Sequence, residues 1–191
     1  MTLAETASIF CETVVTNALL AHADEAEKLA ILEQDLLGST QLVVDIDSRF
    51  RFESAVFERR RERELSVDEL NGLMLEAQAA TYGDALQTDA RHPLMWAYKG
   101  HYYSAGRSFY NFPYTFGYLF GLGLYAQYQA RPDGWHARYD RLLSETGMSD
   151  AAPLAAGFGI DLENPEFWRG GLAVAAGRVA EYEALVERFT L

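Results

Sequence analysis

The sequence predicts an all-α fold. Over most of the 191 residues, apolar side chains recur at spacings of three and four, as on one face of a helix. No segment shows the sustained alternation of apolar and polar residues that marks a half-buried strand. Hydrophobic residues make up 49% of the chain and charged residues 23%, which is typical of a folded globular protein. We therefore expect residues 1–191 to form a single helical unit, either with a full core of its own or as part of a larger domain.

Composition excludes several classes of function. The formal net charge of -12 repels nucleic acid and anionic membranes, so neither is an expected partner. Cys11 is the only cysteine, which rules out an intrachain disulfide and fits a reducing compartment. The N-terminal residues do not resemble a signal peptide, and the longest apolar run is far short of the ~20 residues that cross a bilayer. These features predict a cytoplasmic protein.

The first predicted helix covers residues 2–21, with Thr2 as its N-cap. Glu5, Ser8 and Glu12 fall on one face of this helix, because residues three, four and seven apart are neighbours. Two interpretations stay open for this face. It is either an exposed acidic face at a helix start, or a partly covered one, since apolar residues continue it one turn later.

A very long helix is predicted from about residue 24 to residue 64. Its apolar residues follow a heptad-like seam that is interrupted at residues 38–40 (Gly-Ser-Thr), where we expect a kink or a break. The predicted seam consists of Leu29, Leu32, Leu36, Val43, Ile46, Phe50 and Phe57. Ser66 then caps a helix that reaches Tyr82 and ends at Gly83, with Glu69 completing a capping box.

The densest aromatic run extends from His101 to Tyr128. Asn111 can cap a helix there, with Pro113 tolerated in its first turn. One face of that helix is expected to be core and consists of Phe112, Phe116, Leu119 and Phe120. The other face carries Tyr114, Tyr118, Gly121 and Tyr125. This tyrosine face is either packed on a neighbouring helix or forms the wall of a ligand cleft, because a phenol has an apolar body and a polar tip.

Three more helices are predicted at residues 135–146, 151–158 and 166–189. Along the whole sequence there is no His-Glu-x-x-His, no glycine-rich phosphate loop and no Gly-x-Ser-x-Gly. The chain alone therefore contains no self-sufficient catalytic constellation.

Three segments resemble, in order, the oligoendopeptidase F and thimet oligopeptidase family of zinc metallopeptidases. The residues from Ala4 to Glu12 are similar to the family's Glu-x-x-Ser-x-Phe-x-Glu segment. Those from Phe109 to Tyr118 look like its aromatic motif, with His101 in the place of the preceding histidine. Residues 159–168 resemble the C-terminal segment of the oligoendopeptidase branch. The resemblance implies an all-α bundle like the C-terminal part of that catalytic domain.

The resemblance also implies roles for particular residues. Glu5 would be the third zinc ligand, and Ser8 and Glu12 would orient its helix. His101, together with three tyrosines, would contact the substrate and stabilise the tetrahedral oxyanion. The tyrosines are Tyr110, Tyr114 and Tyr118, and the sequence does not tell which of them plays which part. The implied activity is that of a metalloendopeptidase hydrolysing internal bonds of short peptides.

The sequence departs from the family in lacking the helix that supplies both zinc histidines and the general base. We therefore expect a C-terminal portion of the peptidase that is inactive alone and has an incomplete zinc site. Such a portion is expected to self-associate or to bind a complementary N-terminal half through exposed apolar surface. The alternative is a non-catalytic helical binding or scaffold module that retains the fold.

Overall fold

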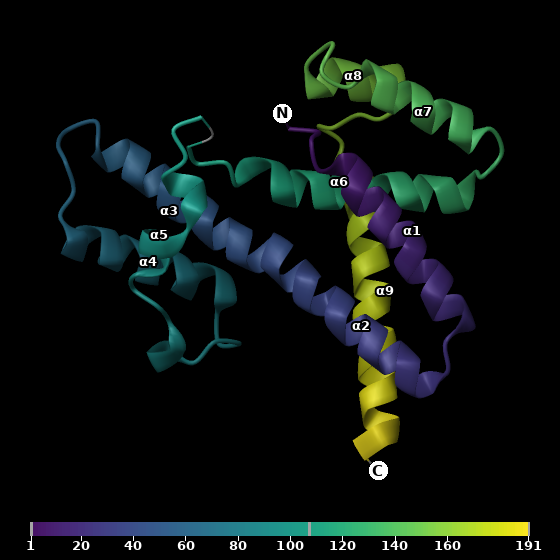
Figure 1. The fold of residues 1–191 in the computed structure, drawn as a ribbon, viewed down its shortest axis with the longest axis horizontal. Coiled ribbons are helices and arrows are strands. Elements are labelled where there is room, and N and C mark those ends of the chain that lie inside the picture. Colours follow the sequence, from purple (N-terminus) through teal and green to yellow (C-terminus); the bar gives the residue numbers. More distant parts are fainter. Residues whose placement is uncertain (1, 107, 191) are drawn as a thin grey trace. The chain divides into compact units, whose positions relative to one another are not determined.

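The computed structural model describes residues 2–106 and 108–190, and its regular elements in that part are helices (Figure 1). The predicted all-α class is confirmed. The longer helices are α1 (Thr6–His22), α2 (Glu25–Thr40), α3 (Ile46–Arg59), α4 (Val67–Tyr82), α6 (Phe112–Ala130), α7 (Trp135–Glu145) and α9 (Pro165–Thr190). The shorter ones are α5 (Met95–Tyr98), α8 (Ala151–Gly157), a π turn at Gln41–Asp45 and 3₁₀ turns at Thr88–Ala90 and Gly100–Tyr102. None of the described helices is long and apolar enough to span a bilayer.

The chain divides into two compact units, which are described separately. The terminal unit consists of Met1–Ser39 and Phe116–Leu191, and the middle unit of Thr40–Thr115. Helices α2 and α6 therefore contribute residues to both. That residues 1–191 belong to one larger catalytic domain stays a prediction.

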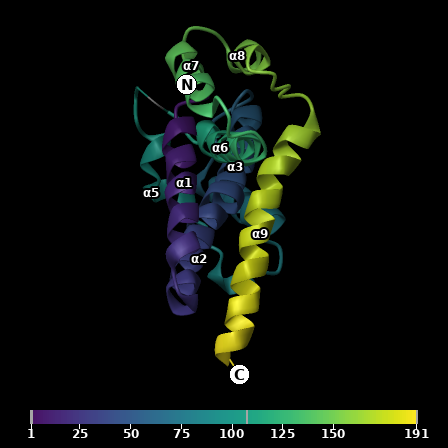
Figure 2. The same cartoon turned by 90° about the vertical axis from the view of Figure 1, so that its right-hand side faces the viewer.

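In the terminal unit, α6 lies between α1 and α9 (Figure 2). Glycines permit the close approach on both sides. A Cβ atom on Gly121 would lie 3.2 Å from the Cγ2 atom of Ile9 in α1, and one on Gly171 in α9 would lie 2.9 Å from the backbone oxygen of Leu119. From residue 117 to residue 125 only Leu119 is not fully buried, because α6 is covered by two neighbouring helices.

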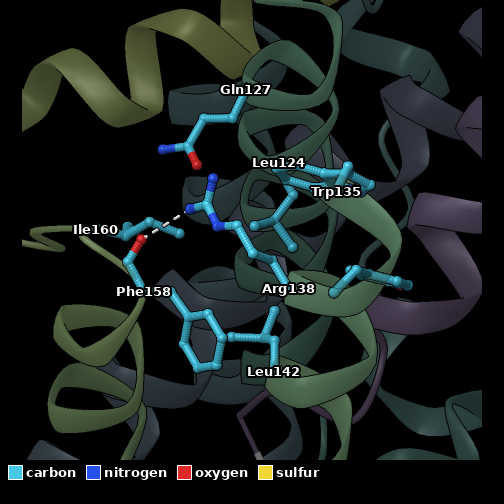
Figure 3. A pocket seen from close by; sticks show the side chains of 8 residues that line it. Leu124, Gln127, Trp135, Arg138, Leu142, Phe158 and Ile160 are labelled. Atoms are coloured by element: carbon cyan, nitrogen blue, oxygen red, sulfur yellow. Dashed lines mark hydrogen bonds between the residues drawn. The ribbon is translucent and has the colours of Figure 1, made fainter. Parts of the chain in front are cut away.

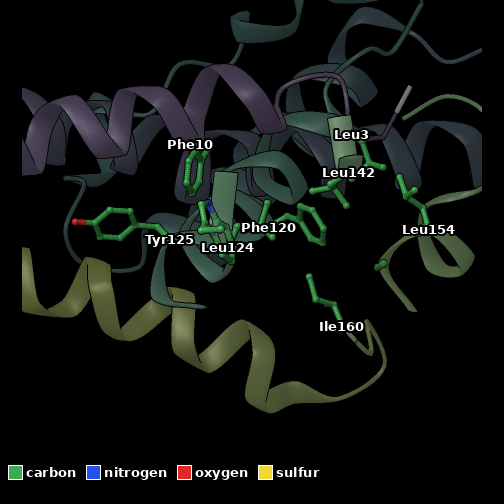
Figure 4. Close-up of a cluster of buried hydrophobic side chains, with 10 residues drawn as sticks. Leu3, Phe10, Phe120, Leu124, Tyr125, Leu142, Leu154 and Ile160 are labelled. Carbon is green, nitrogen blue, oxygen red and sulfur yellow. The ribbon is translucent and has the colours of Figure 1, made fainter. Parts of the chain in front are cut away.

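The core of the terminal unit gathers apolar side chains from α1, α6, α7, α8 and the segment before α9 (Figure 4). Its buried members are Leu3, Phe10, Phe120, Leu124, Tyr125, Trp135, Leu142, Leu154, Ala155 and Ile160. A second cluster joins α1, α2 and α9 through Leu20, Leu32 and Leu185. Beside the apolar clusters, Arg178 forms a buried ion pair with Asp35 at 2.7 Å.

In the middle unit, α3 and α4 pack against each other and against α5. The core residues are Phe52, Val56, Leu73, Met74, Ala77 and Met95. The predicted start and end of α4 are confirmed. Ser66 and Glu69 form the capping box, and Gly83 follows the last residue with φ 56°, a conformation that favours glycine.

Two predictions about helix faces and ends are wrong. Helix α1 begins at Thr6 with Glu5 as the N-cap residue, not at Thr2, because residues 2–5 form a turn that buries Leu3 in the core. Phe50 and Phe57 of the predicted seam are 57% and 54% exposed. The buried face of α3 instead carries Phe52 and Val56, because a π turn separates α2 from α3 and the seam does not continue through it.

The phenylalanine face of α6 is also only partly core. Phe120 is fully buried, but Phe112 in the first turn is 46% exposed. Tyr118 and Tyr125, on the face predicted to be either packed or a cleft wall, are buried. Phe120 on one face and Tyr118 and Tyr125 on the other are buried because α1 and α9 both cover α6.

Candidate functional site

Glu5 lies at the start of α1, where it is half-buried. A Cβ atom on Gly117 of α6 would approach the Cβ atom of Glu5 to 2.9 Å and its carbonyl carbon to 3.3 Å. The absence of a side chain at residue 117 therefore lets the Glu5 backbone lie directly on α6. The carboxylate has no hydrogen-bond or ion-pair partner among the residues that the structure describes.

Ser8 and Glu12 follow Glu5 on α1, and both are exposed. The Ser8 hydroxyl donates to the backbone oxygen of Glu5 at 3.0 Å, so it contacts the predicted ligand residue through its main chain. The charge of Glu12 acts on the phenol of Tyr118 and raises its pKa, as a smaller contribution beside burial. Ser8 thus contacts Glu5, and Glu12 lies near Tyr118.

Tyr118 is 5% exposed, so its phenol is enclosed in the terminal unit. Its hydroxyl oxygen lies 2.6 Å from the hydroxyl oxygen of Ser39 in α2. Burial raises the pKa of Tyr118, and the hydrogen bond with Ser39 offsets part of the rise. The phenol therefore stays protonated and engaged with Ser39.

His101, Tyr110 and Tyr114 meet in the middle unit. The Nε2 atom of His101 lies 3.3 Å from the Tyr114 hydroxyl, and the two rings are perpendicular. The rings of Tyr110 and Tyr114 are 5.8 Å apart at 86°. We call these three residues the His-Tyr cluster. Burial lowers the pKa of His101, and the positive charges of Arg49 and Lys99 lower it further, so the imidazole is neutral at pH 7.

The backbone at Phe109 holds the two ends of this cluster together. Phe109 has φ 58°, which is uncommon for a residue with a side chain and costs ~1–3 kcal/mol. Its N–H donates to the backbone oxygen of His101 at 2.8 Å, and its ring packs on Phe57 and Tyr102. The strained conformation is thus accompanied by contacts that hold the main chain of His101 against Phe109, the residue before Tyr110.

A buried polar network adjoins the His-Tyr cluster, and we did not predict it from the sequence. Asp45, Arg49 and Glu53 follow one another at one-turn spacing along the π turn and α3, and all are buried. The Arg49 guanidinium pairs with the Asp45 carboxylate and donates to the side-chain oxygen of Asn111 at 3.0 Å. The Asn111 side-chain nitrogen donates to the Glu53 carboxylate. We call Asp45, Arg49, Glu53 and Asn111 the buried network.

Glu53 is the residue of this network whose ionisation is most perturbed. Burial raises the pKa of its carboxyl to about 7, although the hydrogen bond from Asn111, the nearby phenol of Tyr102 and the charge of Arg49 oppose the rise. Burial likewise raises the pKa of Tyr102, and the neighbouring Glu53 carboxylate contributes to that rise. Opposite charges four residues apart within an apolar segment were the signal in the sequence for a buried network here.

The sequence-predicted residues thus form two groups, one in each unit. Glu5, Ser8, Glu12 and Tyr118 belong to the terminal unit, and the His-Tyr cluster belongs to the middle unit.

Glu5 is the one residue of this chain that the resemblance assigns to zinc. In proteins zinc takes three or four ligands, from cysteine, histidine or carboxylate side chains. Among the described residues, no three such side chains are grouped to hold a metal. A single carboxylate does not make up that set, so the described residues do not form a zinc site by themselves.

Each unit also contains a cavity. In the terminal unit the cavity is about 10 Å³, roughly one water molecule, and Arg138 crosses it to donate to the backbone oxygen of Phe158 at 3.1 Å (Figure 3). The cavity in the middle unit is about 370 Å³. It is lined by Phe52, Val56, Arg60, Glu64, Leu65, Leu70, Trp96, Tyr102, Tyr103 and Phe109. This second cavity is large enough for a bulky side chain or a small molecule, as is an open hollow of about 540 Å³ in the terminal unit between Ala152 and Glu163.

No known protein family, curated protein or solved structure matches this chain. Its function is therefore argued from the residues and their geometry.

Proposed function

We propose that this chain is part of the catalytic domain of a zinc oligopeptidase, in which it holds the peptide substrate. The observation that carries the proposal is the His-Tyr cluster, where one imidazole and two phenols lie together beside the strained backbone of Phe109. The order of the three sequence segments that resemble this family supports it.

The His-Tyr cluster offers hydrogen-bond donors to a peptide carbonyl. The His101 imidazole and the Tyr114 phenol share a hydrogen bond of 3.3 Å, and we propose that a ligand carbonyl competes for the donors of this pair. Donors that face a carbonyl oxygen stabilise the negative charge that develops on it during hydrolysis, and removing one typically costs ~10²–10³-fold in rate. We assign this role to His101 with Tyr110 and Tyr114.

The remaining predicted residues have supporting roles in the proposed enzyme. Glu5 contributes one carboxylate to the metal site, and Ser8 bonds to its main chain. The other donors belong to a His-Glu-x-x-His segment, which this sequence lacks. We therefore propose that the chain binds zinc weakly and hydrolyses no peptide by itself.

A non-catalytic binding module is the second candidate. The observation that favours it is the cavity of about 370 Å³ in the middle unit, whose walls are mostly aromatic and aliphatic. Such a cavity can take an apolar group of a ligand without any chemistry. Both candidates bind a ligand, and they differ in whether the chain contributes to hydrolysis.

A fluorescence-quenched peptide tests the proposed function in two steps. The purified chain with added zinc is expected to give no turnover. Supplying a polypeptide that carries His-Glu-x-x-His and its general base is expected to restore turnover, which a chelator abolishes. A Glu5→Gln change is expected to abolish the restored activity, whereas Glu163→Gln, on an exposed residue before α9, leaves it unchanged. Turnover that is insensitive to Glu5→Gln would contradict the proposal.

A further inference from the structure

Asn111 occupies the position from which the aromatic helix starts. It directly precedes α6, is 1% exposed, and its backbone oxygen accepts from the N–H of Tyr114 at 3.2 Å. Tyr110 is its chain neighbour. The position of Asn111 therefore sets where both tyrosines of the His-Tyr cluster lie.

The side-chain amide of Asn111 has two different neighbours. Its oxygen accepts from the Nη1 atom of Arg49 at 3.0 Å, and its nitrogen donates to the Glu53 carboxylate. Reversing the amide would place its NH₂ group against the Arg49 guanidinium, which has no acceptor, so the bond to Arg49 would be lost. A cation on one side and a carboxylate on the other thus fix a single orientation.

The two groups that hold Asn111 are themselves fixed. Arg49 is paired with Asp45 one turn earlier on the same helical segment, and Glu53 interacts with Tyr102, the residue after His101. Phe52 and Val56, on the same stretch of α3, lie in the apolar core of the middle unit. The network is therefore anchored to the packed helix α3. It reaches Asn111 on one side of the strained residue Phe109 and Tyr102, next to His101, on the other.

Burying four polar residues in this way is costly, and an apolar core of the same volume is often as stable or more stable. Stability alone does not account for the network. The hydrogen bonds of such a network do, however, specify one arrangement of the groups they join.

We propose that Arg49, Glu53 and Asn111 are positioning residues, which fix the start of α6 so that Tyr114 lies against His101 and Tyr110 against Tyr114, where the proposed function places the peptide carbonyl. The proposal rests on the proposed function for the identity of the ligand. Its geometric part concerns the His-Tyr cluster alone and is tested separately.

Nuclear magnetic resonance of the whole chain provides the test. In Asn111→Leu, which keeps the branched shape of the side chain and removes both hydrogen bonds, we expect the ring contact between His101 and Tyr114 to disappear. In Arg49→Met, we expect the pKa of His101 to rise toward its ordinary value of 6.5, because a nearby positive charge is lost. The matched control is Asn71→Leu, which removes a hydrogen bond from Trp96 in the same unit and is expected to leave the cluster unchanged.

A pair of substitutions at Glu53 separates positioning from general stability. Glu53→Gln keeps an acceptor for Asn111 and is expected to retain the ring contact, whereas Glu53→Leu is expected to lose it. If a variant does not fold, hydrogen exchange measured on the native chain provides the test. The side-chain amide protons of Asn111 are then expected to exchange at least ~10-fold more slowly than those of the exposed Asn164.

An unchanged cluster in folded Asn111→Leu and Arg49→Met would overturn the proposal, as would equal exchange at Asn111 and Asn164. Peptide binding is measured on the same samples. A native chain that binds no peptide but shows the expected changes in the cluster would contradict the proposed function and leave the positioning role supported.

Discussion

The guanidinium of Arg49 donates a hydrogen bond of 3.0 Å to the side-chain oxygen of Asn111, which lies 62 positions further along the chain. This bond joins the interior of α3 to the residue that starts α6. The same asparagine also donates to Glu53, so its side-chain amide is bonded to an ionisable group on each side. The buried network is thus the structural connection on which the position of the His-Tyr cluster depends.

Replacing Arg49 by methionine is expected to destabilise the protein by ~3–5 kcal/mol, because the Asp45 and Glu53 carboxylates then lose their buried cation. Chemical denaturation monitored by circular dichroism measures the change. The control is Arg51→Met on the same helix, where the Asp47 pair is exposed and worth ~0–1 kcal/mol. Equal effects of the two substitutions would show that the Arg49 contacts are not energetically important.

The raised pKa of Glu53 predicts how stability depends on pH. Because the folded-state pKa of about 7 lies above the ordinary value of 4.5, the folded protein holds this proton more tightly than the unfolded chain. The resulting stabilisation is fully present below pH 4.5 and is lost as pH rises through 7. Glu53→Gln keeps the neutral form at every pH. Its free energy of unfolding, relative to the native protein, is therefore expected to increase by ~2–3 kcal/mol from about pH 5 to about pH 8. A difference that does not vary with pH would contradict this prediction.

A methyl group at Gly117 is expected to disturb Glu5. Because the added Cβ atom would lie 2.9 Å from the Cβ atom of Glu5 and 3.3 Å from its carbonyl carbon, Gly117→Ala forces α1 away from α6. We expect a loss of ~1–3 kcal/mol. Gly38→Ala is the control, since nothing lies within 4 Å of its added Cβ atom in α2, and it is expected to stabilise by up to ~1 kcal/mol. Thermal unfolding compares the two, and a stabilised Gly117→Ala protein would rule out the close contact.

The sequence was most informative where local chemistry decides the structure. Ser66 and Glu69 predicted the start of α4, because a capping box is formed by residues three apart. The Nε2 atom of His101 and the hydroxyl of Tyr114 lie 3.3 Å apart, and the role of these residues on a substrate stays a prediction. Phe50 was assigned to the core on helical spacing, but a π turn changes which face of α3 is buried.

The buried network was missed for a different reason. The bonds of Asn111 to Arg49 and Glu53 join residues about sixty positions apart, and no local pattern specifies such pairs. The one available signal was the spacing of Asp45, Arg49 and Glu53, which on a helix is equally typical of an exposed ion-pair ladder. Tertiary packing decides between the two interpretations.

An exposed apolar stripe on α9 predicts that the isolated chain self-associates. Leu172, Val179 and Val186 are spaced by seven residues, so they share one helix face, and each is at least 37% exposed. Sedimentation velocity is expected to show association that increases with concentration and is weakened by Leu172→Gln with Val179→Gln. The control is Met148→Gln, at an exposed residue outside the helices. A native chain that stays monomeric at high concentration would contradict the prediction.

Titration of a labelled short peptide, followed by fluorescence anisotropy, decides whether the His-Tyr cluster binds peptide. We expect saturable binding to the native chain and about tenfold weaker binding to both His101→Ala and Tyr114→Phe, because each substitution removes one hydrogen bond. His136→Ala, at an exposed histidine of α7, is expected to bind like the native chain. Absence of saturable binding, or equal weakening by His101→Ala and His136→Ala, would contradict the assignment of the His-Tyr cluster as the peptide site.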